Sequence, residues 1–124
     1  PVSIAAAHAV LDLLETGEPF TEAARIEGAL VDSVRDLASR FPEIGDIRGH
    51  GAMIAFELVE PGTTTPLAGL AGEIAAYAAS RGVLLLTAGS YGNVIRFLPS
   101  LAVTTEQIEY AVEVIGEALA RPRA

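Results

Sequence analysis

The sequence predicts an α+β fold in which a small antiparallel sheet of three to four strands packs with about four helices. Helix-like and strand-like segments follow one another in the order α-α-β-β-α-β-β-α. Strands that come in pairs favour antiparallel pairing, whereas a doubly wound sheet would need strand and helix to alternate. The chain has 124 residues, of which 51% are hydrophobic. That length and composition suffice for one domain with one core.

The first two helices are expected in the N-terminal third of the chain. The first carries an apolar face and stops at Gly17; the face consists of Ile4, Ala7, Leu11 and Leu14. Thr21 is a good N-cap for the second helix, which Pro42 closes. The buried stripe of that helix is formed by Ile26, Leu30, Val34, Leu37 and Phe41.

Four short strands and two more helices complete the pattern. The strands are expected at residues 44–48, 52–59, 83–87 and 93–98. The segment 53–59 is mostly apolar, which predicts a strand covered on both faces. A third helix is expected over residues 67–81, with Gly82 just after its end. Thr104 and Gln107 form a capping-box signature for the last helix, whose stripe is Ile108, Val112, Ile115 and Leu119.

Composition excludes several kinds of chemistry. All eight basic residues are arginine, and the chain has no lysine and no cysteine. It therefore offers neither a Schiff-base amine nor a thiol nucleophile. The formal charge of −8 and the lack of a basic stripe argue against nucleic acid or a membrane surface as partner. We expect a cytoplasmic protein, and the start on Pro1 without an initiator Met suggests part of a longer chain.

Most polar candidates have a structural interpretation. The segment 48–51, with its two glycines, is expected to be a turn or bulge between strands, because neither a lysine nor GxGxxG spacing accompanies it. His8 and His50 lack the companions that a metal site needs, so no metal is expected. The acids of the helices are interpreted as solvated surface: Asp12, Glu15, Glu18, Glu22, Glu27, Asp32 and Asp36.

Arg96 is the candidate binding residue. It lies within the hydrophobic segment 93–98, just before Pro99, and a guanidinium there is costly to bury unless an anion meets it. Its planar fork suits a carboxylate, and the preceding loop 89–93 carries polar groups able to line a pocket. One alternative stays open at this point: an arginine of an edge strand paired to a surface acid.

Two segments together resemble class III pyridoxal-phosphate-dependent aminotransferases. Residues 41–58 are similar to the family stretch pEIGDvRGxGxMxaiEL, and residues 82–101 are similar to the later strand, loop and arginine. The pattern Gly-x-Tyr-x-Asn-Val-x-Arg most resembles that of 4-aminobutyrate aminotransferases; here it is formed by Gly89, Tyr91, Asn93, Val94 and Arg96. The start at residues 1–3 resembles the sequel to the family's GNP turn, and the likeness covers essentially the whole chain.

The resemblance implies that residues 1–124 are the C-terminal small domain of an aminotransferase. Such an enzyme moves an amino group from 4-aminobutyrate to 2-oxoglutarate with pyridoxal 5'-phosphate as cofactor, and it is a homodimer. The family arginine that matches Arg96 binds the α-carboxylate of glutamate or 2-oxoglutarate. The Schiff-base lysine and the cofactor-binding residues belong to the large domain, so no catalytic or cofactor-binding residue can be mapped here. The isolated chain is expected to be inactive and to hold no covalent cofactor.

Two alternatives remain from the sequence. The chain could be the same lobe of another ω-aminotransferase, acting on acetylornithine, 5-aminovalerate or a β-amino acid. It could instead be a freestanding α+β regulatory module that binds a small amino acid at Arg96. The loop 89–93 distinguishes the first alternative, and binding without a second domain distinguishes the second.

Overall fold

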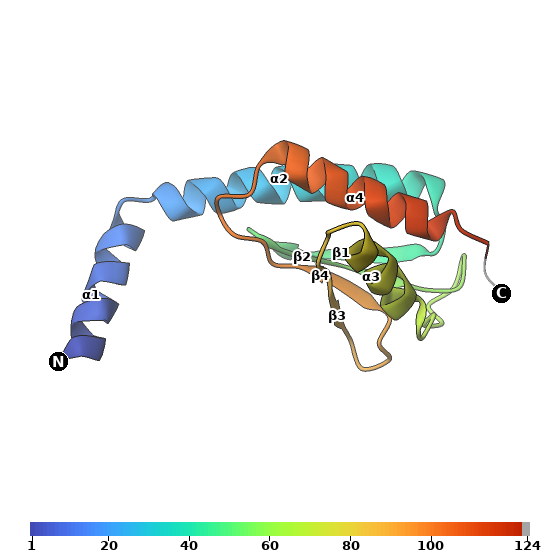
Figure 1. Ribbon diagram of the computed structural model, residues 1–124, viewed down its shortest axis with the longest axis horizontal. Helices are drawn as coiled ribbons and strands as arrows, with labels where there is room; N and C mark the ends of the chain where they lie inside the picture. Colours follow the sequence, from blue (N-terminus) through green and yellow to red (C-terminus); the bar gives the residue numbers. More distant parts are fainter. Residues whose placement is uncertain (123–124) are drawn as a thin grey trace.

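A computed structural model describes residues 1–122, and its elements follow the predicted order (Figure 1). They are α1 (Val2–Glu15), α2 (Glu18–Arg40), β1 (Ile44–His50), β2 (Met53–Leu58), α3 (Leu70–Ser80), β3 (Leu86–Ala88), β4 (Val94–Phe97) and α4 (Thr105–Leu119). The predicted α+β class is confirmed, with four helices and a four-stranded sheet.

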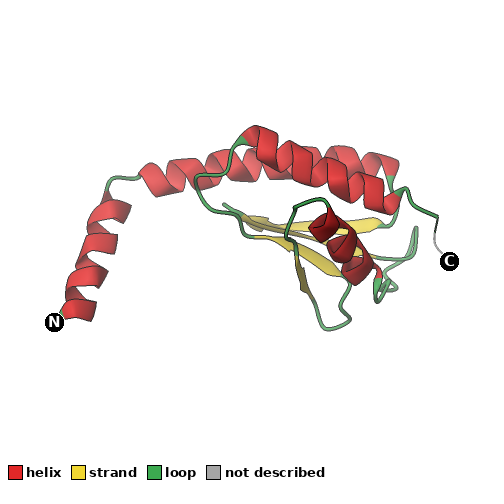
Figure 2. Cartoon of the chain, in the orientation of Figure 1, coloured by secondary structure: helices red, strands yellow, loops and turns green. Residues whose placement is uncertain are grey.

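The sheet is antiparallel throughout, in the order β1-β2-β4-β3, so β2 and β4 are its central strands. Helices α2 and α4 run side by side over the sheet, and α3 lies beside α4 (Figure 2). The core forms between these helices and one face of the sheet. That face contributes Ile54, Phe56, Leu58, Ile95 and Phe97.

The predicted helical stripes are largely the buried ones. In α2 the buried residues are Ile26, Leu30, Val34 and Leu37, while Phe41 is only partly buried. The α4 stripe is buried as expected, and Thr104 and Gln107 form the complete capping box. Glu106, in the first turn of α4, accepts hydrogen bonds from its own backbone N–H and from the Thr104 side chain, and these lower the pKa of its carboxyl. Local signals therefore define this helix well.

Several element boundaries differ from the expectation; α3, for example, begins at Leu70 instead of residue 67, and β1 continues to His50. Helix α2 begins at Glu18 instead of after Thr21, because Gly17 adopts a left-handed conformation (φ 77°) and serves as the N-cap. Strand β3 begins at Leu86 instead of Val83. After α3, the N–H of Gly82 donates to Ala79 O and that of Val83 donates to Ala78 O, which is a Schellman ending. Val83 is thus occupied by the helix cap and cannot start the strand.

The prediction of a strand covered on both faces is wrong for β2. Its burial alternates, with Ile54, Phe56 and Leu58 buried and Met53 exposed. The helices cover one face of the sheet only, and the other face, called the open face below, carries Arg48, Ala55 and Arg96. Apolar Ala55 on the open face made the segment look doubly covered.

Helix α1 extends away from the layered body (Figure 1) and buries none of its residues. The face expected to be apolar exists but is not covered, since Ile4 and Leu11 are more than half exposed. Among residues 1–122, no helix combines the length and the apolar character that crossing a lipid bilayer requires.

Candidate functional site: an arginine on the open face of the sheet

Arg96 lies in β4, with Ala55 of β2 opposite it on one side and Leu86 of β3 opposite it on the other. Paired residues of antiparallel strands point to the same face, so Arg96 belongs to the open face, while its neighbours Ile95 and Phe97 face the core. The alternative of an edge-strand arginine is wrong, because β4 is central in the sheet.

The Arg96 side chain is half-buried and has no polar partner within residues 1–122. Its Nε is fully buried and makes no hydrogen bond to any described residue. The alternative of pairing with a surface acid therefore also fails within the described chain. A buried donor without an acceptor lowers the stability of the folded chain. An acceptor from outside the described residues would remove this cost by accepting a hydrogen bond from Nε.

Arg48 lies on the other side of Ala55 and is in the opposite situation. Its guanidinium donates hydrogen bonds to Asp46 and to Glu57, the latter across 2.7 Å between Nη2 and Oε1. These two acids, Asp46 first and Glu57 second, raise the pKa of Arg48 above its ordinary value. Two arginines thus flank Ala55 on one face, and of these two only Arg96 lacks a partner among the described residues.

The glycine-rich segment 48–51 is a structural hairpin, as expected. Gly51 starts the two-residue loop between β1 and β2 with a positive φ of 59°. Gly49 has φ 140°, and a Cβ there would lie 2.1 Å from the carbonyl oxygen of Met53. The backbones of the two strands approach too closely at this point for any other residue.

One acid interpreted as solvated surface has a structural contact instead. Glu27 of α2 accepts a hydrogen bond from the backbone N–H of Gly51 and lies 3.1 Å from Nδ1 of His50. It therefore ties α2 to the tip of the hairpin. The His50 side chain is 95% exposed, His8 lies exposed on α1, and residues 1–122 contain no cluster of three potential metal ligands.

The loop before β4 contributes less polar surface than expected. Asn93 is buried, and its side-chain amide donates to Leu58 O at 3.0 Å. The N–H of Leu58 in turn donates to Asn93 O at 2.8 Å, so Asn93 extends the pairing of β2 with β4. Ser90 and Tyr91 remain exposed and are the polar side chains of this loop that could meet a ligand.

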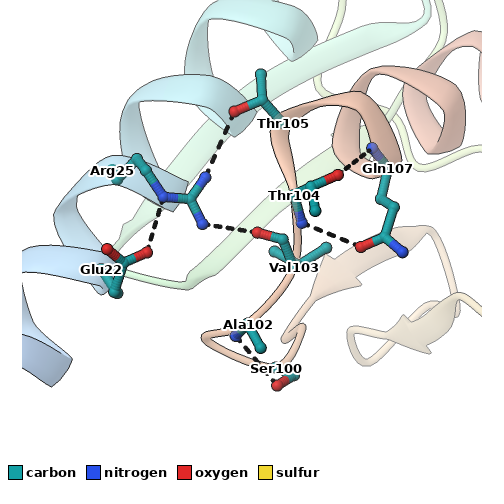
Figure 3. A network of polar contacts seen from close by, with 8 residues as sticks. All are labelled: Glu22, Arg25, Ser100, Ala102, Val103, Thr104, Thr105 and Gln107. Atoms are coloured by element: carbon teal, nitrogen blue, oxygen red, sulfur yellow. Dashed lines mark hydrogen bonds and ion pairs between the residues drawn. The ribbon is translucent and has the colours of Figure 1, made fainter.

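The segment after β4 is fixed by an arginine of α2 (Figure 3). Arg25 donates to the carbonyl oxygen of Val103 at 2.6 Å and to Oγ1 of Thr105 at 3.4 Å, while Glu22 holds its Nε at 2.8 Å. These bonds attach the chain that leaves β4 to the helical layer. The strand that carries Arg96 is paired along both edges, and the segment that connects it to α4 is attached to α2.

Charge distinguishes the open face from the hollows of the helical layer. A hollow of about 600 Å³ between α2 and α4 is lined by five acids and one arginine: Asp32, Asp36, Glu109, Glu113, Glu117 and Arg40. Arg40 is itself bound to Asp36 at 3.1 Å. Such a surface repels an anion, whereas Arg96 attracts one. The open face is accordingly the better place for a carboxylate.

The group formed by Asp46, Arg48 and Glu57 was not predicted from the sequence. A signal for it existed, because a two-residue loop at Gly51 and Ala52 pairs residue 50 with 53 and residue 48 with 55. That register alone places the charges of β1 and β2 on one face. The sequence does not show whether the two acids pair with Arg48 or with Arg96.

Helices cover one face of the sheet, and the open face presents an arginine without a partner among the described residues. A domain of this kind can contribute one wall of an anion-binding site. Residues 1–119 match the family described as Aminotransferase class-III, and the chain belongs to that family. It is 41% identical over 120 residues to the 4-aminobutyrate aminotransferase of Mycobacterium tuberculosis strain H37Rv, covering 97% of this chain and 27% of the relative. It is 40% identical to that of Escherichia coli K12, over 94% of this chain and 28% of the relative.

Other similar proteins are named for other activities. The 5-aminovalerate aminotransferase of Pseudomonas putida is 36% identical, over 97% of this chain and 28% of its own length. An amine transaminase from an uncultivated Pseudomonas species, solved in its PLP-bound form, is 34% identical with a TM-score of 0.78; 94% of this chain covers 26% of it. An Arthrobacter phospholyase, solved with phosphoethanolamine, has a TM-score of 0.86 at 25% identity, covering 99% of this chain and 29% of that one. The chain thus spans little more than a quarter of the relatives' length.

The residues of this chain do not fit a complete pyridoxal phosphate site. The cofactor's aldehyde forms an imine with a primary amine, and the chain contains no lysine among its 124 residues. Arginine stays protonated and cannot replace it. Any residue that binds the cofactor covalently must therefore come from outside these 124 residues.

Proposed function

We propose that this chain is the C-terminal small domain of an aminotransferase that moves an amino group from 4-aminobutyrate to 2-oxoglutarate. In this proposal Arg96 binds the α-carboxylate of the oxo acid, and the pyridoxal phosphate is held by the part of the enzyme outside residues 1–124. The observation that carries the proposal is the unpartnered Arg96 guanidinium on the open face. The names of the relatives support the reaction class and the donor.

The role of this chain in that reaction is to bind and to orient. Arg96 offers two parallel N–H donors to one carboxylate, which fixes both the position and the plane of the bound oxo acid. The apolar neighbours Ala55 and Leu86 offer no competing polar group to Arg96, so the guanidinium stays available to the carboxylate. The oxo group of the bound acid would then lie beyond the open face, where the cofactor held by the remaining part of the enzyme would supply the chemistry.

Replacing Arg96 by Lys in the complete enzyme tests this role. Lysine keeps the charge but loses the bidentate geometry, and a charged hydrogen-bonded pair contributes about 1.5–3 kcal/mol. We expect the KM for 2-oxoglutarate to rise about 10-fold to 100-fold. The measurement is steady-state formation of glutamate from 2-oxoglutarate with 4-aminobutyrate as amino donor, and Arg40→Lys is a matched control on the helical layer. An Arg96→Lys enzyme with the KM of the Arg40→Lys control would remove Arg96 from the site.

The amino donor is tested separately from the anchor. Comparing kcat/KM for 4-aminobutyrate and 5-aminovalerate separates the two named activities, because one methylene in a pocket changes the ratio about 10-fold or more. A clear preference for 5-aminovalerate would overturn the donor while leaving Arg96 in place. Acetylornithine and a β-amino acid complete the donor panel.

The freestanding module is tested on the 124-residue chain alone. If Arg96 forms only one wall of the site, titration with glutamate or 2-oxoglutarate should give no heat of binding at millimolar ligand. Saturable binding that Arg96→Lys abolishes would favour the regulatory module instead. The homodimer and the cytoplasmic location remain predictions.

A further inference from the structure

Glu57 occupies a position between the two arginines of the open face. Arg48 and Arg96 both lie directly opposite Ala55, one from each neighbouring strand. Glu57 is two residues further along β2 and points to the same face, so it is a diagonal neighbour of both arginines. Diagonal neighbours in a sheet lie about 7–8 Å apart, which long side chains can bridge.

The acid has a definite partner in the structure. Glu57 Oε1 accepts a hydrogen bond from Arg48 Nη2 at 2.7 Å, while Asp46 accepts one from Nη1 of the same guanidinium. Arg96 has no partner among residues 1–122. Two acids therefore bind Arg48 and none binds Arg96, although Glu57 is a diagonal neighbour of both arginines.

The other residues that flank Arg96 on the open face carry no charge, so the pairing of Glu57 determines whether Arg96 is free. Within the described residues, the positions that flank Arg96 on the open face are Met53, Ala55 and Glu57 in β2, and Leu86 and Ala88 in β3. Glu57 is thus the one carboxylate next to Arg96 in this part of the sheet. If Glu57 paired with Arg96, its carboxylate would occupy the guanidinium N–H groups that the carboxylate of the proposed oxo acid requires.

We propose that Arg48 is a positioning residue, which holds Glu57 away from Arg96 and so keeps the Arg96 guanidinium free for an incoming carboxylate. The inference rests on the proposed function, since it concerns the same anion site. Arg48 does not touch the ligand. It acts by competing with Arg96 for the carboxylate of Glu57, while Asp46 accepts a hydrogen bond from its other terminal nitrogen, Nη1.

Four versions of the complete enzyme test the inference: wild type, Arg48→Met, Glu57→Gln and Arg48→Met with Glu57→Gln. In Arg48→Met, Glu57 is released to pair with Arg96, and the KM for 2-oxoglutarate should rise roughly threefold to fivefold, as expected for competition by a partly exposed ion pair. The kcat should stay within about twofold, because saturating substrate displaces the acid. Glu57→Gln alone should leave the KM unchanged or lower it.

The double variant is the decisive measurement. Removing the Glu57 charge removes the competitor, so the KM should return to the wild-type value even though Arg48 is absent. A double variant as impaired as Arg48→Met would overturn the proposal, because Arg48 would then act by direct contact with the ligand or by supporting the fold. Equal thermal unfolding midpoints of the single and double variants exclude loss of folding as the cause of any rescue.

The two proposals fail in different ways. If Arg96→Lys leaves the KM unchanged, the carboxylate anchor is wrong and the positioning role falls with it. If Arg96→Lys raises the KM but Arg48→Met does not, the anchor stands and the positioning role of Arg48 is wrong.

Discussion

Arg96 keeps a buried Nε without an acceptor among the described residues. Such a donor destabilises a folded protein by roughly 1–3 kcal/mol, whereas an apolar side chain of similar shape does not. Arg48, fifty per cent exposed and bound to two acids, carries no such cost. The two arginines on either side of Ala55 should therefore respond to the same substitution with opposite signs.

Replacing each arginine by methionine in the 124-residue chain tests this difference. Arg96→Met should raise the free energy of unfolding by about 1 kcal/mol, because it removes the unpaired donor and keeps the packing of the stem. Arg48→Met should lower it by up to about 1 kcal/mol, because it removes the ion pairs of Arg48 with Asp46 and Glu57 and leaves Asp46 without a cation. Urea unfolding monitored by circular dichroism measures both. Destabilisation by Arg96→Met would mean that the arginine supports the fold.

The hairpin of β1 and β2 determines which charges share the open face. Its geometry depends on Gly49, where a Cβ would lie 2.1 Å from Met53 O and 2.8 Å from the Cα of Ile54. Neither contact can be relieved by a side-chain rotation, since both partners are backbone atoms. The register that pairs Arg48 with Ala55 therefore depends on a glycine at position 49.

Gly49→Ala is expected to destabilise the chain by about 3 kcal/mol, since it combines an unfavourable φ with a backbone clash. Gly62→Ala is the matched control, because Gly62 also has a positive φ (74°) but open space around its Cα. It should cost about 1 kcal/mol. Equal losses in the two variants, measured by urea unfolding, would show that the clash at Gly49 is relieved by movement of the strands.

The sequence predicted elements well where the signal is local and less well where it depends on packing. The capping box at Thr104 and the stop at Gly82 are local hydrogen-bond patterns, and both are confirmed. The start of α2 was misplaced because Gly17 also serves as an N-cap, which a glycine does without a side-chain signature. The burial of β2 was misjudged because an apolar strand does not reveal how many layers cover it.

The candidate site shows the same division. The presence of a costly guanidinium at position 96 could be inferred from its apolar neighbours in sequence. Its central position in the sheet arises from the pairing of β2 with β4, segments about 40 residues apart in sequence, whereas Arg48 and Glu57 belong to one local hairpin. Long-range pairing of this kind has no local signature in a single sequence.

At the scale of the whole molecule, α1 differs from the other helices in burying none of its residues. An isolated helix of its length is marginal in water, because helix formation needs tertiary contacts to offset the cost of nucleation. We expect α1 to be the least protected helix of the 124-residue chain. Residues 26–37 of α2 contain the stripe that packs against the core, and their amides should be protected most strongly.

Amide hydrogen exchange measures this difference directly. The amides of residues 3–14 should exchange at rates close to those of an unfolded peptide, while those of residues 26–37 should exchange orders of magnitude more slowly. Comparable protection of the two segments would show that α1 is held by contacts with the body of the chain. The same experiment on the complete protein would report whether its remaining part covers α1.

Strand β4 is hydrogen-bonded to a neighbour along each edge, and Arg25 fixes the chain beyond its end. Sliding the strand by one pleat would break two ladders at once, so the Cα of Arg96 is a fixed reference point within the fold. A carboxylate bound by Arg96, as proposed, would therefore be held at a fixed position relative to the sheet. Arg96 is proposed to bind the oxo acid and not the amino donor, so a difference in donor between relatives named for 4-aminobutyrate and for 5-aminovalerate would arise from other residues while this strand stays unchanged.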